Sequence, residues 1–132
     1  MQQEVFGGPE GRAGEGEAAR EAALPPNVLV YRIDGPFFFG AAEKLESTIE
    51  RAQLHVGTVV IRLGRVPFMD ATGMHTLSEI IERFQRRGIR VVLCGIQERL
   101  SRSLERAGIL ALVGPDNVCA DMAEVARRVT PA

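Results

Sequence analysis

The chain has 132 residues, of which 45% are hydrophobic and 25% are charged, a balance typical of one soluble globular domain. Its formal net charge of −1 provides no basic surface of the kind that nucleic acids require, so we expect no DNA or RNA partner. No window reaches the run of about 18 apolar residues needed for a membrane span, and the amino terminus lacks a signal-peptide pattern.

Residues 1–26 differ in composition from the rest of the chain. Gly, Glu, Ala and Arg dominate this stretch, and Pro25-Pro26 ends it. Such a composition buries too little apolar surface to offset the conformational entropy lost on ordering. We therefore predict a disordered leader or linker over residues 1–26, followed by one folded domain over residues 27–130.

The first half of the predicted domain begins with a hairpin. Residues 28–33 are β-branched and aromatic, Asp34-Gly35-Pro36 has turn chemistry, and Phe37-Phe38-Phe39 is consistent with a short returning strand. Apolar residues at steps of three and four then predict a helix over about residues 41–54. The β-branched run at residues 58–63 predicts a strand that is buried on both faces and lies at the centre of a sheet.

Helices and strands continue to alternate in the second half of the chain. Apolar stripes predict three helices. The first stripe contains Met74, Leu77, Ile81 and Phe84, the second Leu100, Leu104 and Ala107, and the third Met122, Val125 and Val129. Gly88 and Gly108 are predicted to end the first two of them. Strands are predicted over residues 89–95 and at Val118-Cys119. This alternation implies crossover connections and a largely parallel inner sheet, which is an α/β sandwich.

The sequence contains no recognisable catalytic or metal-binding constellation. Cys94 and Cys119 lie in apolar contexts without CxxC spacing, so we expect buried, reduced thiols. His55 and His75 are not spaced as metal ligands, no nucleophile is paired with a base, and no Walker-type loop is present. We therefore predict no catalytic activity, no metal and no cofactor.

Asp70-Ala71-Thr72-Gly73 lies between the strand at residues 58–63 and the helix predicted from Met74. A side-chain oxygen of Asp70 can accept a hydrogen bond from an unpaired N–H group at the start of that helix. Gly73 allows close approach of another surface or a strained turn, and Thr72 lies where the helix N-terminus favours an anion. The pattern fits either a structural cap or a functional face, and caps are the commoner of the two.

These residues resemble the STAS domain, which occurs in bacterial anti-sigma-factor antagonists and in the cytoplasmic tails of SulP-type anion transporters. The resemblance covers roughly residues 27–130. Two stretches are similar to the transporter branch. They are residues 28–45, VLVYRIDGPFFFGAAEKL, and residues 108–118, GILALVGPDNV. Stand-alone antagonists tend to have a polar, Asp-containing segment in place of the Phe run. The resemblance implies a STAS-like sandwich with a mostly parallel sheet of about four to five strands and about four to five helices.

The resemblance also implies a regulatory, protein-interaction role without transport or catalysis by this chain alone. The implied partner is the membrane domain of a bacterial SulP-type sulfate or anion permease, on the cytoplasmic side of the inner membrane. A cytosolic regulatory protein or a second copy of the chain are further partners. The implied site comprises Asp70, Ala71, Thr72, Gly73 and Met74, and we consider Phe37, Phe38 and Phe39 as candidate docking aromatics.

Two alternative functions remain open. In antagonists that resemble this domain, the Ser or Thr two residues after the Asp is the phosphate acceptor, and Thr72 matches that position. Ala71 replaces the Ser that is frequent there, which is a departure from the family pattern. A nucleotide-binding module is the third reading, and it is disfavoured because no Lys is positioned to reach a phosphate.

Overall fold

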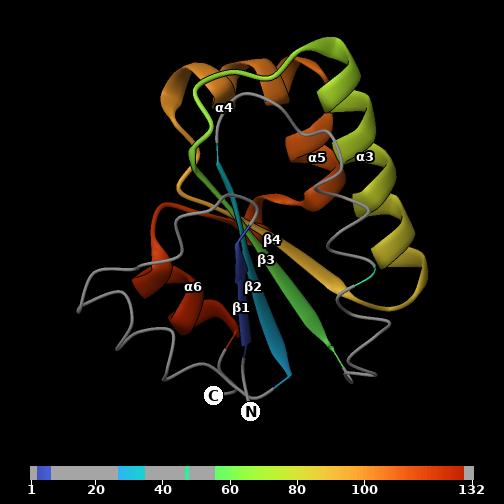
Figure 1. Cartoon of the computed structure of the whole chain (residues 1–132), viewed down its shortest axis with the longest axis vertical. Coiled ribbons are helices and arrows are strands. Elements are labelled where there is room, and N and C mark those ends of the chain that lie inside the picture. Colours follow the sequence, from blue (N-terminus) through green and yellow to red (C-terminus); the bar gives the residue numbers. More distant parts are fainter. Residues whose placement is uncertain (1–2, 7–26, 35–46, 48–55, 130–132) are drawn as a thin grey trace.

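The computed structural model describes residues 3–6, 27–34, 47 and 56–129. Within this part of the chain, five parallel strands form one sheet in the order β1-β2-β3-β4-β5 (Figure 1). The strands are β1 (Gln3–Phe6), β2 (Val28–Asp34), β3 (Thr58–Arg65), β4 (Arg90–Cys94) and β5 (Val118–Cys119). The predicted returning strand at residues 37–39 lies outside the described residues, as does the predicted helix over 41–54 apart from Ser47.

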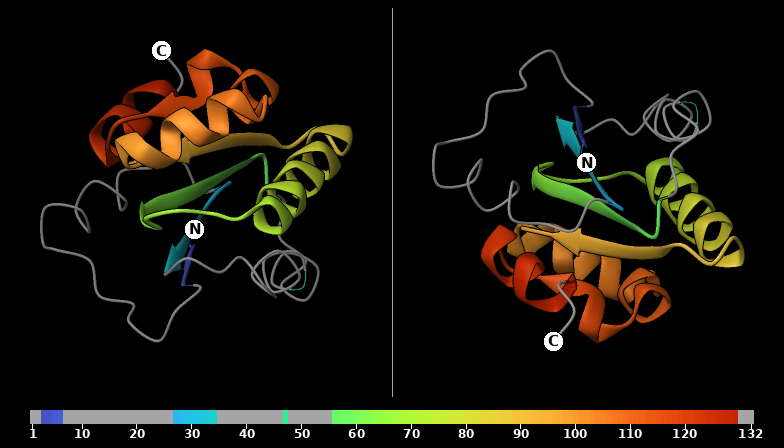
Figure 2. Two further views of the ribbon diagram at one scale, coloured as in Figure 1. Left: turned by 90° about the horizontal axis from the view of Figure 1, so that it is seen from above. Right: turned by 90° about the horizontal axis from the view of Figure 1, so that it is seen from below.

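In the described chain, helices connect β3 to β4 and β4 to β5, because parallel neighbours can be joined only by a crossover that returns to the other end of the sheet. The helices of the described chain are α3 (Ala71–Arg86), α4 (Glu98–Arg106), α5 (Ile109–Val113) and α6 (Met122–Val129), with a short 3-10 helix at Pro115–Asn117. Figures 1 and 2 show α3 and α5 on one side of the sheet and α6 on the other. The predicted α/β sandwich with a parallel sheet is confirmed.

Two apolar cores lie on the two faces of the sheet. Successive strand residues point to opposite faces, so each strand contributes to both. The larger core joins alternate residues of β2, β3 and β4 to the apolar sides of α3, α4 and α5, with Tyr31, Ile61, Leu93 and Phe84 among its fully buried members. The smaller core consists of Val28, Val30, Val60, Val92, Cys94, Cys119, Met122 and Val125. The buried central strand predicted at residues 58–63 is largely confirmed, with Thr58 and Arg62 half-buried.

The predicted helix ends in the second half of the chain are confirmed at the glycines. Gly88 and Gly108 have φ angles of 76° and 79°, a left-handed conformation that a side chain would strain. Two details differ from the prediction. Ala107 is exposed and lies just after α4 rather than on its buried stripe. The five-residue helix α5, which buries Ile109 and Val113 after Gly108, had no predicted counterpart because it is too short to show a helical period.

The prediction of a leader without structure over residues 1–26 is wrong for Gln3–Phe6. These residues form β1, which pairs in parallel with β2 from Gln3 opposite Leu29 to Phe6 opposite Arg32. The composition of residues 1–26 as a whole is polar and rich in glycine, and it conceals the short stretch QEVF. An edge strand needs little side-chain burial, because backbone hydrogen bonds to its neighbour provide much of its attachment. Residues 7–26 lie outside the described residues.

Candidate functional site

The loop after β3 leads into α3 through a side-chain cap. Asp70 has an extended backbone conformation, with φ −80° and ψ 176°, and its Oδ1 atom accepts a hydrogen bond from the backbone N–H of Gly73 at 2.7 Å. The N–H of Met74 donates to the carbonyl oxygen of Asp70 at 2.9 Å, which is the first helical bond. The prediction that Asp70 caps the helix is confirmed. The helix begins at Ala71, three residues before the predicted start at Met74.

The side chains of the cap divide between solvent and core. Asp70, Ala71 and Thr72 are exposed, and the exposure of Thr72 agrees with what the sequence led us to expect. Met74 is half-buried and packs against the larger core. The candidate docking aromatics Phe37, Phe38 and Phe39 lie outside the described residues.

Of the two roles considered for Gly73, close approach and a strained turn, the structure shows the first. Gly73 is buried, and its φ angle is not positive, so no strained turn requires a glycine there. A Cβ atom at this position would lie 2.7 Å from Cγ of Met69 and 3.2 Å from Oδ1 of Asp70. The surface that approaches Gly73 closely is therefore the side chain of Met69 in the same loop, which packs beneath the first turn of α3.

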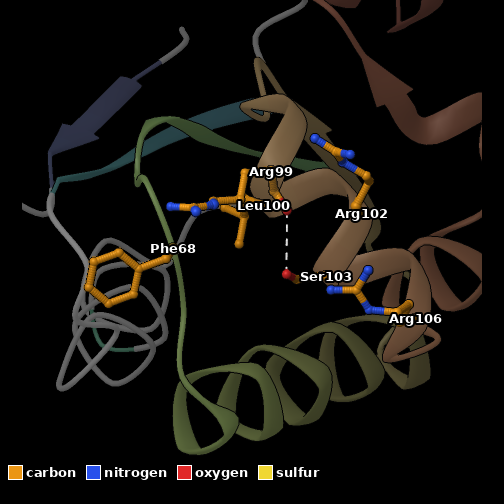
Figure 3. A pocket seen from close by; sticks show the side chains of 6 residues that line it. All are labelled: Phe68, Arg99, Leu100, Arg102, Ser103 and Arg106. Atoms are coloured by element: carbon orange, nitrogen blue, oxygen red, sulfur yellow. Dashed lines mark hydrogen bonds between the residues drawn. The ribbon is translucent and has the colours of Figure 1, made fainter.

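A cavity of about 460 Å³ lies between the loop and α4 (Figure 3). Phe68 of the loop lines one side, and its side chain is 52% exposed, the one large hydrophobic side chain of the described residues that is exposed. The other described lining residues belong to α4, namely Arg99, Leu100, Arg102, Ser103 and Arg106. Sequence reasoning missed this groove. The available signals were an unpaired Phe in a loop and arginines that recur at steps of three and four along one helix.

The groove combines an apolar patch with positive charge. Leu100 is fully buried beneath it, and Figure 3 shows Arg99 extending toward the loop that carries Phe68. Arg102 lies 3.7 Å from the carboxylate of Glu98, and both side chains are largely exposed, so this ion pair is a weak one. Exposed aromatic side chains flanked by arginines are typical of protein interfaces rather than of catalytic sites.

The described residues offer little for metal or thiol chemistry. They contain no group of three or more His, Cys, Asp or Glu side chains that could hold a metal ion. Cys94 and Cys119 are buried and form no disulfide, as predicted, and burial raises the pKa of the Cys119 thiol. A raised pKa lowers the fraction of reactive thiolate at neutral pH. Among these residues, no helix has the length and apolar character that a membrane crossing requires.

Two solved structures similar to this chain are named as a SulP transporter domain and as a sulfate transporter family protein. The STAS domain of a SulP transporter from Vibrio cholerae is 42% identical, with a TM-score of 0.70 over 77% of this chain and 83% of that one. A sulfate transporter family protein from Wolinella succinogenes is 32% identical, with a TM-score of 0.76 over 88% of this chain and 95% of the other.

Similar full-length proteins are much longer than this chain. YvdB of Bacillus subtilis, named as a sulfate transporter, is 30% identical over 90 residues, which are 67% of this chain and 17% of YvdB. Sulfate transporter 1.2 of Arabidopsis thaliana is 23% identical over 124 residues, 84% of this chain and 19% of that protein. The chain thus spans less than about a fifth of the length of these relatives.

The family model for the STAS domain matches residues 19–125, which include every described element after β1 except the last turn of α6. The fold agrees with this match, because both similar solved structures align over most of the chain. The chain therefore belongs to the STAS domain family, and its relatives are the STAS domains of SulP-type sulfate transporters.

Proposed function

We propose that this chain is the cytoplasmic STAS domain of a SulP-type sulfate or anion transporter, and that it acts by binding protein partners rather than by catalysis or transport. The observation that carries this proposal is the similarity to the Vibrio cholerae SulP domain, at 42% identity over most of both chains. The small share of YvdB that the chain spans supports a role as one part of a larger transporter.

The partner-binding face is proposed to combine the capped loop with the groove beside it. Phe68 supplies an exposed apolar anchor, and the arginines of α4 surround it with positive charge. Asp70 fixes the start of α3, so Thr72 is held in a defined position two residues further along. A rigid helix start next to an apolar anchor favours recognition, because little side-chain entropy is lost on binding.

The proposed partner is the cytoplasmic surface of the membrane domain, with a cytosolic regulator or a second copy as alternatives. Phosphorylation of Thr72 would add about −1.5 to −2 charges at neutral pH. The N-terminus of α3 would attract that charge, whereas the nearby Asp70 carboxylate would repel it. The fold should therefore survive the modification while a contact made through Thr72 is weakened.

Gene context provides the first test of this proposal. A reading frame that precedes or contains this sequence and encodes about a dozen apolar spans of about 20 residues each would supply the membrane domain. If the neighbouring genes instead encode a kinase and a sigma factor, the chain is a stand-alone antagonist and the proposal is wrong.

The second test co-expresses the chain with that membrane domain and measures their co-purification in detergent. Phe68→Ala and Thr72→Glu should reduce the amount of chain recovered, and Thr72→Ala should not. Ala111→Glu adds the same charge as Thr72→Glu at an exposed position of α5, so it serves as the matched control. Equal recovery of all four variants, with unchanged melting curves, would exclude this face as the contact.

A further inference from the structure

A second cavity lies at the carboxyl ends of the parallel strands, on the face of the sheet that α6 covers. Its volume is about 290 Å³, and its lining includes Arg32 of β2, Arg62 and Arg65 of β3, and Asp121 just before α6. The carboxyl ends of strands in open parallel sheets are where such folds commonly bind ligands. The family resemblance did not point to this cavity.

The position of the arginines follows from the alternation of the strands. Val28 and Val30 belong to the smaller core, so Arg32 continues the same face of β2 at its carboxyl end. Arg62 is the register partner of Arg32 on β3, which places the two guanidinium-bearing side chains on adjacent strands. Arg32 is only 4% exposed and is the one buried charged residue of the described chain. Burial of a guanidinium group is costly unless anionic or polar groups compensate its charge.

Two glycines keep the cavity open. Gly64 lies two residues after Arg62 on β3, and Gly95 follows the last residue of β4. A Cβ atom on Gly64 would lie 3.5 Å from the carbonyl oxygen of Gly95, which is an ordinary contact. The backbone therefore tolerates a side chain at position 64. By the alternation of β3, that side chain would extend from the same face as Arg62 and fill the space in front of it.

Among the described residues, the charges around the cavity are predominantly positive, with three arginines and one carboxylate, that of Asp121, in its lining. Oδ1 of Asp121 already accepts a hydrogen bond from the backbone N–H of Glu124 at 2.9 Å, so it helps to cap α6. All three arginines also interact within the chain, and a ligand would therefore join an existing polar network.

We infer that this cavity binds a small tetrahedral oxyanion, a phosphate or sulfate group, between Arg32 and Arg62 with Arg65 at the rim. The planar fork of a guanidinium group matches the paired oxygens of such anions better than any other side chain does. The volume equals that of about ten water molecules, at about 30 Å³ each. It therefore accommodates an inorganic oxyanion with part of its hydration shell, or the phosphate group of a small organic ester.

The experiment measures anion binding to the complete chain by isothermal titration calorimetry. Sodium sulfate, sodium phosphate and glycerol 3-phosphate are titrated separately at an ionic strength held constant with sodium chloride. We expect one saturable site for at least one of these anions. Stronger binding of an inorganic anion identifies a free ion as the ligand, and stronger binding of glycerol 3-phosphate identifies an organic phosphate.

Two variants and one control locate the site. Arg62→Gln removes a guanidinium group, and Gly64→Val keeps every charge but fills the cavity, so each should weaken binding at least tenfold. Arg87→Gln removes an exposed arginine after α3, far from the cavity in sequence, and should bind like the unmodified chain. Melting curves identify any variant that does not fold. If Gly64→Val does not fold, the affinity of Arg62→Gln alone tests the location of the site.

Three results would overturn the inference. They are the absence of saturable binding for all three anions, binding that Arg62→Gln leaves unchanged, and an equal loss of binding in Arg62→Gln and Arg87→Gln. The last result would mean that anions bind through net charge alone. Because the measurement needs no membrane domain, its outcome is independent of the co-purification test for the proposed function.

Discussion

At the scale of single residues, Asp70 contributes to the start of α3 through one hydrogen bond to the N–H of Gly73. Asp70→Ala removes the acceptor, and we expect the free energy of unfolding to fall by roughly 0.5 to 2 kcal/mol. Asp70→Asn keeps a side-chain oxygen at the cap, so its free energy of unfolding should fall much less. Urea denaturation of the three proteins tests this. Equal losses in both variants would show that the carboxylate charge, rather than the cap, is what matters.

Tyr31 presents the opposite situation, a polar atom without a partner. Its side chain is fully buried in the larger core, and its hydroxyl oxygen has no hydrogen-bond partner in the described structure. Burial also raises the pKa of this hydroxyl. Tyr31→Phe should therefore be at least as stable as the unmodified chain, with a gain on the order of 1 kcal/mol. A clear loss of stability in a thermal melt would reveal a partner for the hydroxyl.

Residue roles were predictable from sequence where the cause is local. The cap at Asp70 depends on a spacing of three residues, which the sequence displays directly. The burial of Gly73 against Met69 and the exposure of Phe68 depend on how the loop crosses the end of the sheet, and no periodic pattern encodes that path. The pairing of Arg32 with Arg62 requires the register of β2 and β3, which residues far apart in sequence determine together.

At the scale of elements, α6 is held at its start by reciprocal hydrogen bonds. The carboxylate of Glu124 accepts from the N–H of Ala120 at 2.7 Å and from Nη2 of Arg128 at 2.6 Å, while the N–H of Glu124 donates to Asp121. The bond from Ala120 is the main cause of a lowered Glu124 pKa, and Arg128 adds to it. This arrangement resembles a capping box.

The lowered pKa gives α6 a pH dependence with a definite sign. A carboxyl group with a depressed pKa in the folded state stabilises that state above its unfolded pKa of about 4.3, and this contribution disappears as the pH falls through the folded value. Glu124→Gln lacks the contribution at every pH. Urea midpoints should therefore be lower for Glu124→Gln at pH 7 and should converge with the unmodified chain toward pH 3. A difference that stays constant over this range would contradict the assignment.

Element identity was predictable from sequence wherever a stripe spans two turns or more. The stripes of α3, α4 and α6 repeat at helical spacing, and Gly88 and Gly108 mark two of the ends. β1 has four residues, QEVF, that do not alternate between polar and apolar, and α5 has five residues, fewer than two helical turns. Their formation depends on the neighbours that they pack against, and that information is not local.

At the scale of the whole molecule, β1 lies at one edge of the sheet, beside β2. Residues 28–33 of β2 are all buried, so β2 has the character of an inner strand. A chain that starts at Gly7 lacks β1 and leaves the outer backbone groups of β2 without their partners. We expect a loss on the order of 1 to 3 kcal/mol in the free energy of unfolding, because several backbone hydrogen bonds disappear.

The same truncation should also promote self-association, since an unpaired inner strand can pair with another chain. Urea denaturation measures the loss of stability, and sedimentation velocity measures the association. A truncated chain that remains monomeric and unfolds at the midpoint of the complete chain would show that Gln3–Phe6 is dispensable, as the composition of residues 1–26 first suggested.

The unequal sizes of the two cores have a consequence for slow motion. α6 attaches to the sheet chiefly through Met122 and Val125, and the thiol of Cys94 lies 3.7 Å from the sulfur of Met122. Opening of α6 alone would disrupt the smaller core and leave the larger one intact, so its amide hydrogens should exchange with deuterium by a local, low-energy route. Such an opening would also uncover the two thiols that α6 shields. Labelling of Cys94 and Cys119 under native conditions should therefore proceed at the opening rate of this one helix, well ahead of amide exchange in β3.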